Sequence, residues 1–394
     1  MTGPEDVRVD VLVVGAGQAG LGTGHHLARR TSLSFLIVDG ADRIGDSWRR
    51  RWDSLVLFTP RRFSSLPGTA MPHGPGGYAS KDEAADYFEG YAARERLPVR
   101  LRTRVLAVAG DHDGGFVAET TTGRIRARHV IVATGPYTAP YVPDAADVLD
   151  PEVAQLHSAS YRAPDDLPGE DVLVVGAGNS AAQLAVELAD TGRRVTVAAP
   201  GGMWFLPARL LGVSVYWWFR LTGVLNSPST SRVSRMVRAR GDGIIGRDLQ
   251  DLVAAGKVRM HRQRVVGAHG RTAVLADGTE VPADAVLWCT GYQPDHPWLR
   301  VPGALDEQGR PVHDAGRSPV AGLHWVGLPW QTRLNSGIID GVDRDARDAV
   351  RRIAAERPRS AAAAAVHDRP VAPGTAAPPG TLSSPSAPTA GEAA

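Results

Sequence analysis

Cysteine and long hydrophobic runs are scarce in this chain of 394 residues. The single cysteine, Cys289, excludes an intramolecular disulfide and a redox-active cysteine pair, and it favours a reducing compartment. No stretch approaches the roughly 20 apolar residues of a membrane-spanning helix. A basic segment followed by an apolar one, which would indicate a secretory signal, is also missing from the N-terminus. We therefore predict a cytoplasmic protein with no membrane span.

Lysine is almost absent, occurring only at Lys81 and Lys257, so that the basic residues are nearly all arginine. Arginine-rich surfaces can bind phosphate backbones, but 42 acidic residues are interspersed with the arginines and the formal net charge is only +2. The charge therefore does not predict a nucleic-acid partner. A hydrophobic fraction of 43% suits a globular protein, and the length allows two domains.

The sequence Val-Leu-Val-Val-Gly-Ala-Gly occurs twice, at Val11–Gly17 and at Val172–Gly178. Each copy runs from an apolar strand through a glycine turn into a helix-like segment and then a second apolar strand. Continuous apolar strands around a helix indicate parallel strands that are buried on both faces. Each copy therefore predicts one βαβ unit of an α/β fold. The predicted helices are Gln18–Arg30 and Asn179–Asp190, and the second strands are Leu33–Val38 and Val195–Ala198.

A hairpin and a further strand follow each βαβ unit. The turns are Thr122-Gly123 and Asp277-Gly278, and the strands after them are VIVATGPY at Val130–Tyr137 and AVLWCTGY at Ala285–Tyr292. The segment beyond Tyr292 has no glycine turn of its own and ends in a predicted helix at Ile339–Ala355. We infer that this segment returns to the first domain, so that the second domain is an insertion.

The first glycine turn, Gly15-Ala16-Gly17-Gln18-Ala19-Gly20, has the pattern of a dinucleotide site. Its first glycine makes the tight turn, its second lets the backbone approach a pyrophosphate, and its third permits close packing of helix and strand. The helix N-terminus adds N–H groups and positive potential. Asp39, about 20 residues further on, ends the next strand, where a carboxylate can bond ribose hydroxyls.

The second turn, Gly176-Ala177-Gly178-Asn179-Ser180-Ala181, replaces the third glycine with alanine, which is a tolerated change. No acid ends the next strand, where residues 198–200 are Ala-Ala-Pro, and an acid there would repel a 2′-phosphate. This favours NADPH, although NADH is not excluded. We expect the two turns to bind two different dinucleotides, FAD at the first and NADPH at the second. The arginines that are candidates to approach the phosphate are Arg193, Arg194 and Arg209.

The predicted fold class is thus α/β with two Rossmann-like dinucleotide-binding domains. Residues 5–150 and 285–356 form the FAD domain, and residues 165–284 form the NAD(P)H domain inserted in it. Residues 357–394, rich in Ala, Pro and Ser, are predicted to be a disordered tail. Since Cys289 has no partner, we interpret it as a small core residue, and no metal-ligand cluster or nucleophile-elbow motif is apparent.

On these residues the chain resembles the class B flavin-dependent monooxygenases. These are FAD/NADPH enzymes that include flavin-containing, plant indole-pyruvate and Baeyer–Villiger monooxygenases. The likeness extends over most of the chain. The motifs that carry it are GAGQAG with Asp39, RIGDSWRRRWDSLVLFTPRRFSSLPG at Arg43–Gly68, VATG before Pro136, HSASY at His157–Tyr161, GAGNSA and CTGY.

The resemblance implies roles for particular residues. His157 is expected in the linker between the domains and is a candidate catalytic residue, although Pro151 and Val153 depart from the family fingerprint before it. Thr59 stands where some members place an asparagine against the flavin, and it is the second candidate catalytic residue. Trp52–Pro60 is similar to the loop beside the isoalloxazine ring. The remaining implied flavin contacts are Gly45, Ser47, Trp48, Val105 and Gly135.

The implied activity is oxygen insertion. NADPH would reduce the flavin, and one oxygen atom from O2 would pass through a C4a-(hydro)peroxyflavin to a small apolar substrate. The alternatives are an NAD(P)H-dependent flavin reductase or oxidase without oxygen insertion, and a non-catalytic dinucleotide-binding module. Met203–Gly223, rich in aromatics, is interpreted as an apolar lid, a shallow membrane contact or a helix packed between domains. Pro329–Gly341 is expected to return to the flavin, and the oligomeric state is not predicted.

Overall fold

The computed structural model describes residues 5–74, 77–241 and 243–356. The described residues up to Ala355 form one compact unit. All the sheets and helices below belong to this unit. The tail predicted at residues 357–394 lies outside the described residues.

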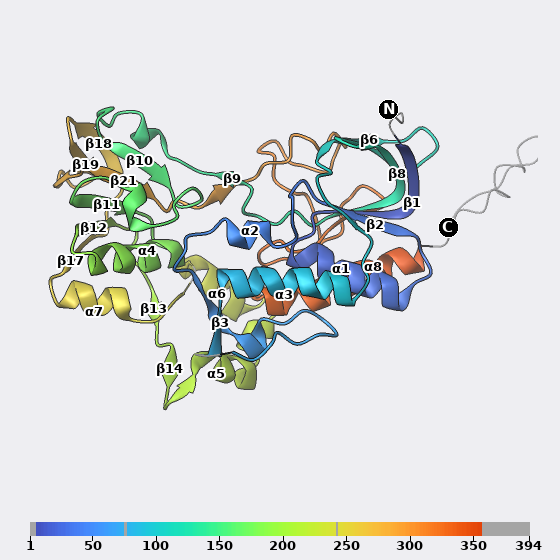
Figure 1. Ribbon diagram of the computed structural model, residues 1–394, viewed down its shortest axis with the longest axis horizontal. Helices are drawn as coiled ribbons and strands as arrows, with labels where there is room; N and C mark the ends of the chain where they lie inside the picture. The colour runs from blue at the N-terminus through green and yellow to red at the C-terminus, as the bar shows by residue number, and fades with distance from the viewer. Residues whose placement is uncertain (1–4, 75–76, 242, 357–394) are drawn as a thin grey trace, which may run out of the picture. The chain divides into compact units, whose positions relative to one another are not determined.

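The first sheet is mixed and has its longest parallel strands in the middle (Figure 1). β1 pairs in parallel with β2 on one side and with β8 on the other, while β6, β7 and β8 are antiparallel. β23 lies parallel to the end of β8, with Trp325 opposite Val132, so the chain returns to this sheet near its end. The strands in sheet order are β5 (Val99–Arg100), β2 (Phe35–Val38), β1 (Glu5–Val14), β8 (Gly123–Val132), β7 (Phe116–Thr120) and β6 (Val105–Gly110), with β23 (Leu323–Trp325) beside β8.

The second sheet is entirely parallel, and a small antiparallel sheet accompanies it. Its central strand is the second copy of the repeated sequence. The strands in sheet order are β10 (Ala154–His157), β21 (Ala285–Trp288), β11 (Asp171–Val175), β12 (Arg194–Ala198) and β17 (Val258–His261), and the antiparallel sheet is β18 (Val265–His269), β19 (Thr272–Leu275) and β20 (Glu280–Pro282).

Both central strands are buried on their two faces, which is why they are continuously apolar. In β1, Val11 and Val13 belong to one hydrophobic cluster, and Leu12 and Val14 belong to another on the opposite face. β11 divides in the same way, with Val172 and Val174 in one cluster and Leu173 and Val175 in another. The chain therefore has a mixed α/β fold with parallel sheets, as the apolar runs predict.

Helices cover these sheets. α1 packs against α3 and α8 beside the first sheet, and α4 packs against β11, β12 and α7 beside the second. Among the described residues, no helix is both long and apolar enough to cross a bilayer. The helices are α1 (Gln18–Arg30), α2 (Asp46–Arg49), α3 (Lys81–Arg94), α4 (Asn179–Asp190), α5 (Val215–Thr222), α6 (Arg232–Arg240), α7 (Asp248–Ala254) and α8 (Val342–Ala355).

Four short strand pairs complete the unit. β9 and β22 pair antiparallel, with Tyr292 opposite Pro140, where the chain leaves the first sheet for the second and where it returns. The pairs are β9 (Ala139–Pro140) with β22 (Tyr292–Gln293), β3 (Val56–Pro60) with β4 (Tyr78–Ser80), β13 (Phe205–Leu206) with β16 (Ile244–Ile245), and β14 (Arg209–Leu210) with β15 (Val213–Ser214).

The two hairpins predicted after the βαβ units are confirmed, but the strands beyond them differ. In the first copy the hairpin strand and the VIVATG strand are one continuous strand, β8. In the second copy the chain breaks between β20 and β21, after Pro282. There Asp284 accepts hydrogen bonds from the backbone N–H groups of Glu170 and Asp171 at 2.7 and 3.0 Å. The break therefore arises from a proline and from a carboxylate that binds the start of β11.

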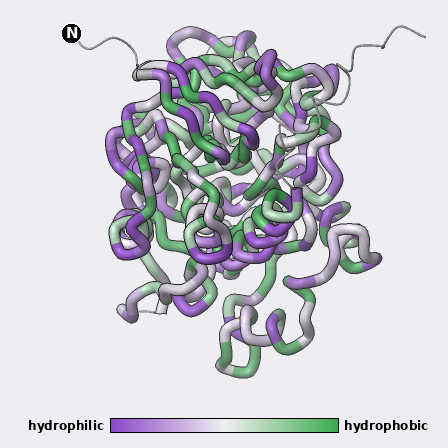
Figure 2. Tube along the Cα trace, turned by 90° about the vertical axis from the view of Figure 1, so that its right-hand side faces the viewer, coloured by the Kyte–Doolittle hydropathy of each residue, from purple (hydrophilic) through white to green (hydrophobic). Residues whose placement is uncertain are grey.

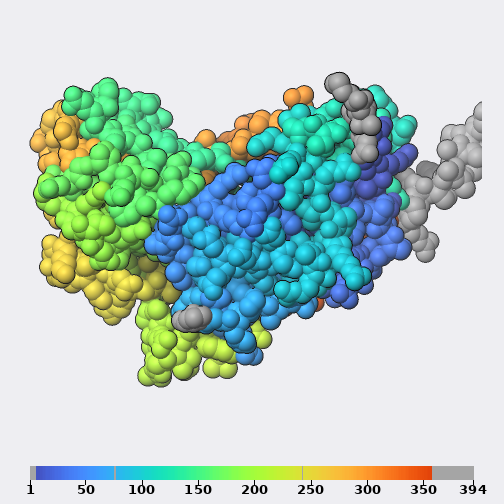
Figure 3. Space-filling model, viewed as in Figure 1, coloured from blue at the N-terminus to red at the C-terminus, as the bar shows by residue number. Residues whose placement is uncertain are grey.

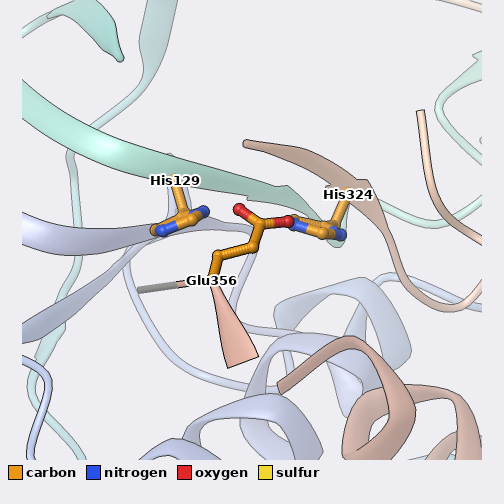
Figure 4. Close-up of side chains that lie close together, drawn as sticks. All are labelled: His129, His324 and Glu356. Carbon is orange, nitrogen blue, oxygen red and sulfur yellow. The ribbon is translucent and has the colours of Figure 1, made fainter. Parts of the chain in front are cut away.

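Two buried histidines lie on neighbouring strands, His129 on β8 and His324 on β23, with ring centroids 6.2 Å apart (Figure 4). Burial lowers the pKa of His324 to about 3, and electrostatic interactions with His129, Arg352 and Arg317 act in the same direction. Neither ring nitrogen of His324 has a hydrogen-bond partner among the described residues. The ring is therefore neutral in the folded protein.

Acid is expected to destabilise the fold through His324. Its pKa in the folded protein lies below that of an unfolded chain, about 6.5, so the unfolded state takes up the proton first and stability falls as the pH falls below that value. Between pH 7 and pH 5.5 the loss is about 1 kcal/mol. We expect His324→Leu to remove this part of the pH dependence in chemical denaturation. If the free energy of unfolding fell equally steeply with decreasing pH in the parent protein and in His324→Leu, a neutral buried His324 would be contradicted.

Candidate dinucleotide-binding sites

The first glycine turn connects β1 to α1, and its backbone explains two of its glycines. Gly15 has φ +108°, and a Cβ there would lie 2.7 Å from the carbonyl oxygen of Ala133. A Cβ at Gly20 would lie 1.8 Å from the carbonyl oxygen of Gly15. At Gly17, by contrast, a Cβ would meet no described atom within 4 Å. Gly15 and Gly20 are therefore required by packing, while Gly17 leaves open space at the helix start.

The N-terminus of α1 is free to bind an anion. Its N-cap residue is Gly17, and no side chain caps it. The first N–H groups of an α-helix have no partner within the helix, so here they point into the space that Gly17 leaves open. Such an uncapped helix start beside a missing side chain fits a pyrophosphate.

Asp39 follows β2 and lies beside this turn. One carboxylate oxygen accepts a hydrogen bond from the backbone N–H of Ala16 at 2.7 Å, and the other accepts one from Ala41 at 2.8 Å. These bonds fix the side chain next to the turn, and each oxygen keeps a further lone pair. The geometry therefore fits a carboxylate that also accepts hydrogen bonds from ribose hydroxyls.

Segments distant in the sequence surround the first turn. Gln18 donates from its side chain to the carbonyl of Gly337 at 3.3 Å, so Pro329–Gly341 lies beside α1, while its return to a flavin stays a prediction. Gly327 packs against Ala19, where a Cβ would approach the alanine Cβ to 2.6 Å. No local pattern in the sequence marks Gly327, because its contact depends on β23 returning to the first sheet. Gly135, just beyond β8, has φ +70° and open space where a Cβ would be.

The other implied flavin contacts lie around the first sheet. Gly45, with φ +89°, precedes α2, and a Cβ there would lie 2.7 Å from the Cα of Ala85 in α3. Trp48 is half-buried against Phe88, at 6.3 Å between ring centroids, whereas Ser47 is exposed. Val105 begins β6, close to Asp39, whose carbonyl accepts a hydrogen bond from Thr103 N at 2.8 Å. Their contact with a flavin stays a prediction.

Thr59 lies in β3 and is buried, with its side chain directed within its own loop. Its hydroxyl shares a 2.7 Å hydrogen bond with the hydroxyl of Ser64. Ser64 also lies 3.2 Å from the carbonyl oxygens of Thr59 and Pro60. The hydroxyl therefore has a structural partner, and a catalytic role for Thr59 stays a prediction.

The second turn repeats the geometry of the first. Gly176 has φ +152°, and a Cβ there would lie 2.4 Å from the carbonyl oxygen of Cys289. Gly178 is the uncapped N-cap of α4 and has no described atom within 4 Å of a Cβ. Ser180 is half-buried and Ala181 is buried. Asn179 bonds instead to the backbone of β16 and the residue before it, through Ile245 N at 3.4 Å and Gly243 O at 3.3 Å.

The arginines expected near the second turn lie elsewhere. Arg194 begins β12 and forms ion pairs with Glu170 and Asp171 at 2.6 and 2.7 Å, at the end of the sheet opposite the glycine turn. Arg193 donates to the carbonyl of Pro164 at 2.6 Å. Arg209 is exposed in the β14–β15 hairpin, away from the start of α4 (Figure 1).

Arg262, which the sequence did not indicate, lies at the carboxyl end of the second sheet. β12 and β17 end side by side, with Ala199 N bonded to His261 O at 2.8 Å. The side chain of Arg262 lies 3.3 Å from where a Cβ of Gly202 would be. This cation is therefore near the end of β12, where the sequence has no acid.

Cys289 is a buried core residue in the described structure. It follows β21 and packs on Gly176 as Ala133 packs on Gly15, so it occupies the corresponding position in the second copy. Burial raises the pKa of its thiol to about 12. A protonated thiol is neither a nucleophile nor a redox partner at neutral pH.

His157 ends β10 and is held by the backbone at both ring nitrogens. Its Nδ1 accepts from Ala159 N at 3.0 Å, and its Nε2 donates to the carbonyl of Gly291 at 3.0 Å. Burial, with a smaller contribution from the charge of Arg51, lowers the pKa of His157. The neutral ring therefore ties β10 to the turn before β22.

A cation–aromatic cluster surrounds His157 at the crossing between the sheets. The guanidinium of Arg51 lies 5.9 Å from the ring centroid of Tyr137 and 5.5 Å from that of Tyr292. The Tyr292 ring contacts His157 edge-on at 5.4 Å. Tyr137 and Tyr292 follow the same Thr-Gly motif in the two copies, allowing for Pro136, which is a sequence pattern that could have pointed to this cluster.

The loop Trp52–Val56 joins the two halves of the unit. Trp52 packs in the hydrophobic cluster of the second sheet, and Asp53 N bonds to Arg162 O at 2.8 Å. Between this loop and the flank of α4 is a pocket of about 370 Å³. Its lining includes the carboxylates of Glu187, Asp190 and Asp248, which disfavour a phosphate. This acidic pocket is therefore unlike the helix N-termini at Gly17 and Gly178, which favour a phosphate.

Several known proteins are similar to this chain in sequence and in fold. Residues 12–215 match the family model described as pyridine nucleotide-disulphide oxidoreductase. An uncharacterized oxidoreductase CzcO-like of Geobacillus kaustophilus is 43% identical, over 86% of this chain and 96% of its own. Indole-3-pyruvate monooxygenase YUCCA1 of Oryza sativa subsp. japonica is 28% identical, over 75% of this chain and 79% of its own. The solved structure of a flavin-containing monooxygenase from Stenotrophomonas maltophilia is 31% identical, with a TM-score of 0.72 over 88% of this chain and 98% of its own.

These similarities extend well beyond the glycine turns. The family model spans more than half of the chain, and the relative and the solved structure match nearly their whole lengths. One relative is named as a monooxygenase, and the solved structure is named as a flavin-containing monooxygenase. The chain therefore belongs to the pyridine nucleotide-disulphide oxidoreductase family, as a flavin-dependent oxidoreductase of the class B flavin monooxygenase-like group.

Proposed function

We propose that the protein is an FAD-dependent, NADPH-using monooxygenase that transfers one oxygen atom from O2 to a small apolar organic substrate. The first sheet and its helices form the FAD domain, and the second sheet forms an inserted NADPH domain, both Rossmann-like. When bound, the flavin supplies hydride acceptance and oxygen activation, which no side chain can supply. The chain's own residues bind, orient and shield the two cofactors.

The first half has the groups that FAD requires. The N–H groups at the start of α1 bind the pyrophosphate in the space beside Gly17, and Asp39 accepts hydrogen bonds from ribose hydroxyls. Trp52 and its loop, packed on the second half, shield the region between the cofactors from water.

The second half has the charge that suits NADPH. Gly178 leaves space for the pyrophosphate at the start of α4. Arg262 lies near the end of β12, where a 2′-phosphate would follow the ribose and where no carboxylate would repel it. His157, neutral and bonded to Gly291, positions the linker between the halves.

The observation that favours oxygen transfer over disulfide reduction is that Cys289 is single, buried and protonated. Disulfide reduction through a redox-active cysteine pair needs two cysteines, and this chain has one. That cysteine is buried with a pKa of about 12. Electrons from a reduced flavin therefore go to oxygen or to a small acceptor.

The test is a double-mixing experiment on the FAD-loaded protein. The flavin is reduced anaerobically with NADPH or NADH and then mixed with oxygenated buffer while its absorption is followed. We expect faster reduction by NADPH, and then a transient spectrum, distinct from reduced and oxidised flavin, that persists while NADP⁺ is bound. Direct return to oxidised flavin with stoichiometric hydrogen peroxide would instead support a reductase or oxidase. Lack of reduction by either nucleotide would contradict both activities.

A further inference from the structure

Residues 203–241 form a segment, here called the basic lobe, with an unusual charge. The sequence has six arginines and no aspartate or glutamate in this range, although the whole chain has 42 acidic residues. The lobe contains β13, β14, β15, α5 and α6. It therefore presents positive charge alone, unlike the mixed surface elsewhere. The arginines are Arg209, Arg220, Arg232, Arg235, Arg238 and Arg240.

Large apolar side chains are exposed on the same lobe. Leu211, at the tip of the β14–β15 hairpin, is 83% exposed, and Leu221 in α5 is 78% exposed. Trp217 lies one turn before Leu221 on the same helix face and is 41% exposed. Hydrophobic stretches appear at the lower end of the molecule in Figure 2, and the β14–α5 region projects there in Figure 3. The other exposed apolar residues of the lobe are Leu210, Val213, Val233 and Met236.

The lobe is anchored, so these side chains are held outward by folded structure. Tyr216 and Trp217 contact the ring of Phe63 at 6.1 and 5.1 Å, and Trp218 donates from its indole to Leu210 O at 3.2 Å. The backbone after α5 bonds to the loop near the first site, through Ser229 N and Thr332 O at 2.9 Å. Only Val215 and Tyr216 of α5 are buried, in a small cluster with Phe63, so most of this helix faces outward, and the role of Met203–Gly223 stays a prediction.

The arginines of the lobe have no carboxylate at ion-pair distance within the described part of the chain. In α6, residues Arg232, Arg235 and Arg238 recur every three residues, and only Ser234 is buried. A basic helix with exposed apolar side chains is typical of a membrane-surface contact. Two copies of the lobe would repel each other, because each carries positive charge alone.

We propose that the basic lobe docks on the surface of an anionic phospholipid bilayer. The leucines of α5 and of the hairpin tip enter the region between headgroups and acyl chains, while the arginines bind lipid phosphates. Aliphatic side chains at a projecting tip gain most from insertion into lipid, whereas a nucleic acid would leave them in water. The docking does not depend on the oxygenation chemistry.

The experiment is sedimentation of the FAD-loaded full chain with vesicles of phosphatidylcholine, with or without phosphatidylglycerol. We expect binding to the anionic vesicles that weakens as salt is added, and little binding to the neutral ones. Leu211→Asn with Leu221→Gln should weaken binding at least about tenfold, since each leucine gives up apolar burial. Asparagine suits position 211, where φ is +51°. Arg232→Gln with Arg235→Gln and Arg238→Gln should weaken binding to a similar extent.

The matched control is Leu106→Thr with Val266→Thr, two exposed apolar residues outside the lobe at 51% and 50% exposure. It should bind like the parent chain, and all variants should keep their flavin content and circular dichroism. Equal binding to neutral and anionic vesicles, or equal losses in control and lobe variants, would overturn the proposal. Two further results would overturn the proposal. In the first, the protein does not bind vesicles and Leu211→Asn with Leu221→Gln converts an oligomer into monomers. In the second, the protein does not bind vesicles and is retained only on DNA.

Discussion

A protein carrying Gly178→Val is expected to stay folded and yellow, while NADPH reduces its flavin at least about a hundredfold less efficiently. Gly178 has φ −102°, which any residue adopts, and a Cβ there meets no described atom within 4 Å. The valine therefore costs the fold little but fills the space where a pyrophosphate would approach α4. Loss of two charge-assisted hydrogen bonds, about 1.5–3 kcal/mol each, accounts for the magnitude.

The measurement is the anaerobic rate of flavin bleaching as NADPH is varied. Gly267→Val is the matched control, because it lies in the same half of the unit and also has no atom within 4 Å of a Cβ. It should leave reduction within about twofold of the parent rate. If Gly178→Val reduced as fast as its control, NADPH would have to bind elsewhere.

Gly17→Val is expected to have the complementary effect, giving a folded protein without colour. Gly17 has φ −76° and open space at its Cβ, but that space is where FAD would lie beside α1. We expect at least about a hundredfold weaker FAD binding for the same reason as at Gly178. The fold itself should lose about 1 kcal/mol, since valine is a poorer N-cap than glycine.

Flavin content after purification and titration of the apoprotein with FAD measure this effect. Gly110→Val, in β6 with open space at its Cβ, is the control and should bind FAD normally. Gly20→Val provides a contrast, because its Cβ would lie 1.8 Å from Gly15 O and should prevent folding. A yellow, fully loaded Gly17→Val protein would show that FAD does not bind at the first turn.

The local elements could be predicted closely from the sequence. α1 and α4 have the expected bounds, Gln18–Arg30 and Asn179–Asp190, because each starts directly after a glycine turn and ends where apolar periodicity stops. The bounds of β8 could not be predicted from the sequence, because the two parts of this strand differ in their pattern of burial. Residues 123–129 alternate between exposed and buried positions, whereas Val130–Val132 are continuously buried beside β23.

The side chains around the second turn were harder to predict because they depend on sheet order. Arg193 precedes β12 and Arg194 begins it, and in a parallel sheet that end is opposite the glycine turn. Arg262 lies at the same end of the sheet as the glycine turn only because β17 pairs with β12. No local sequence pattern specifies that these two strands pair. The contact of Arg51 with the rings of Tyr137 and Tyr292 likewise depends on where the chain crosses between the sheets.

The pairing of β9 with β22 has a consequence for protein engineering. Because Pro140 lies opposite Tyr292, the two ends of the segment 141–291 are neighbours in space. A segment whose ends are adjacent can be exchanged between related chains, or moved into another scaffold, with two short junctions and no long linker. The half around the second sheet and the half around the first are in this sense separable modules, and chimaeras of related chains joined at β9 and β22 would combine the second-sheet half of one relative with the first-sheet half of another.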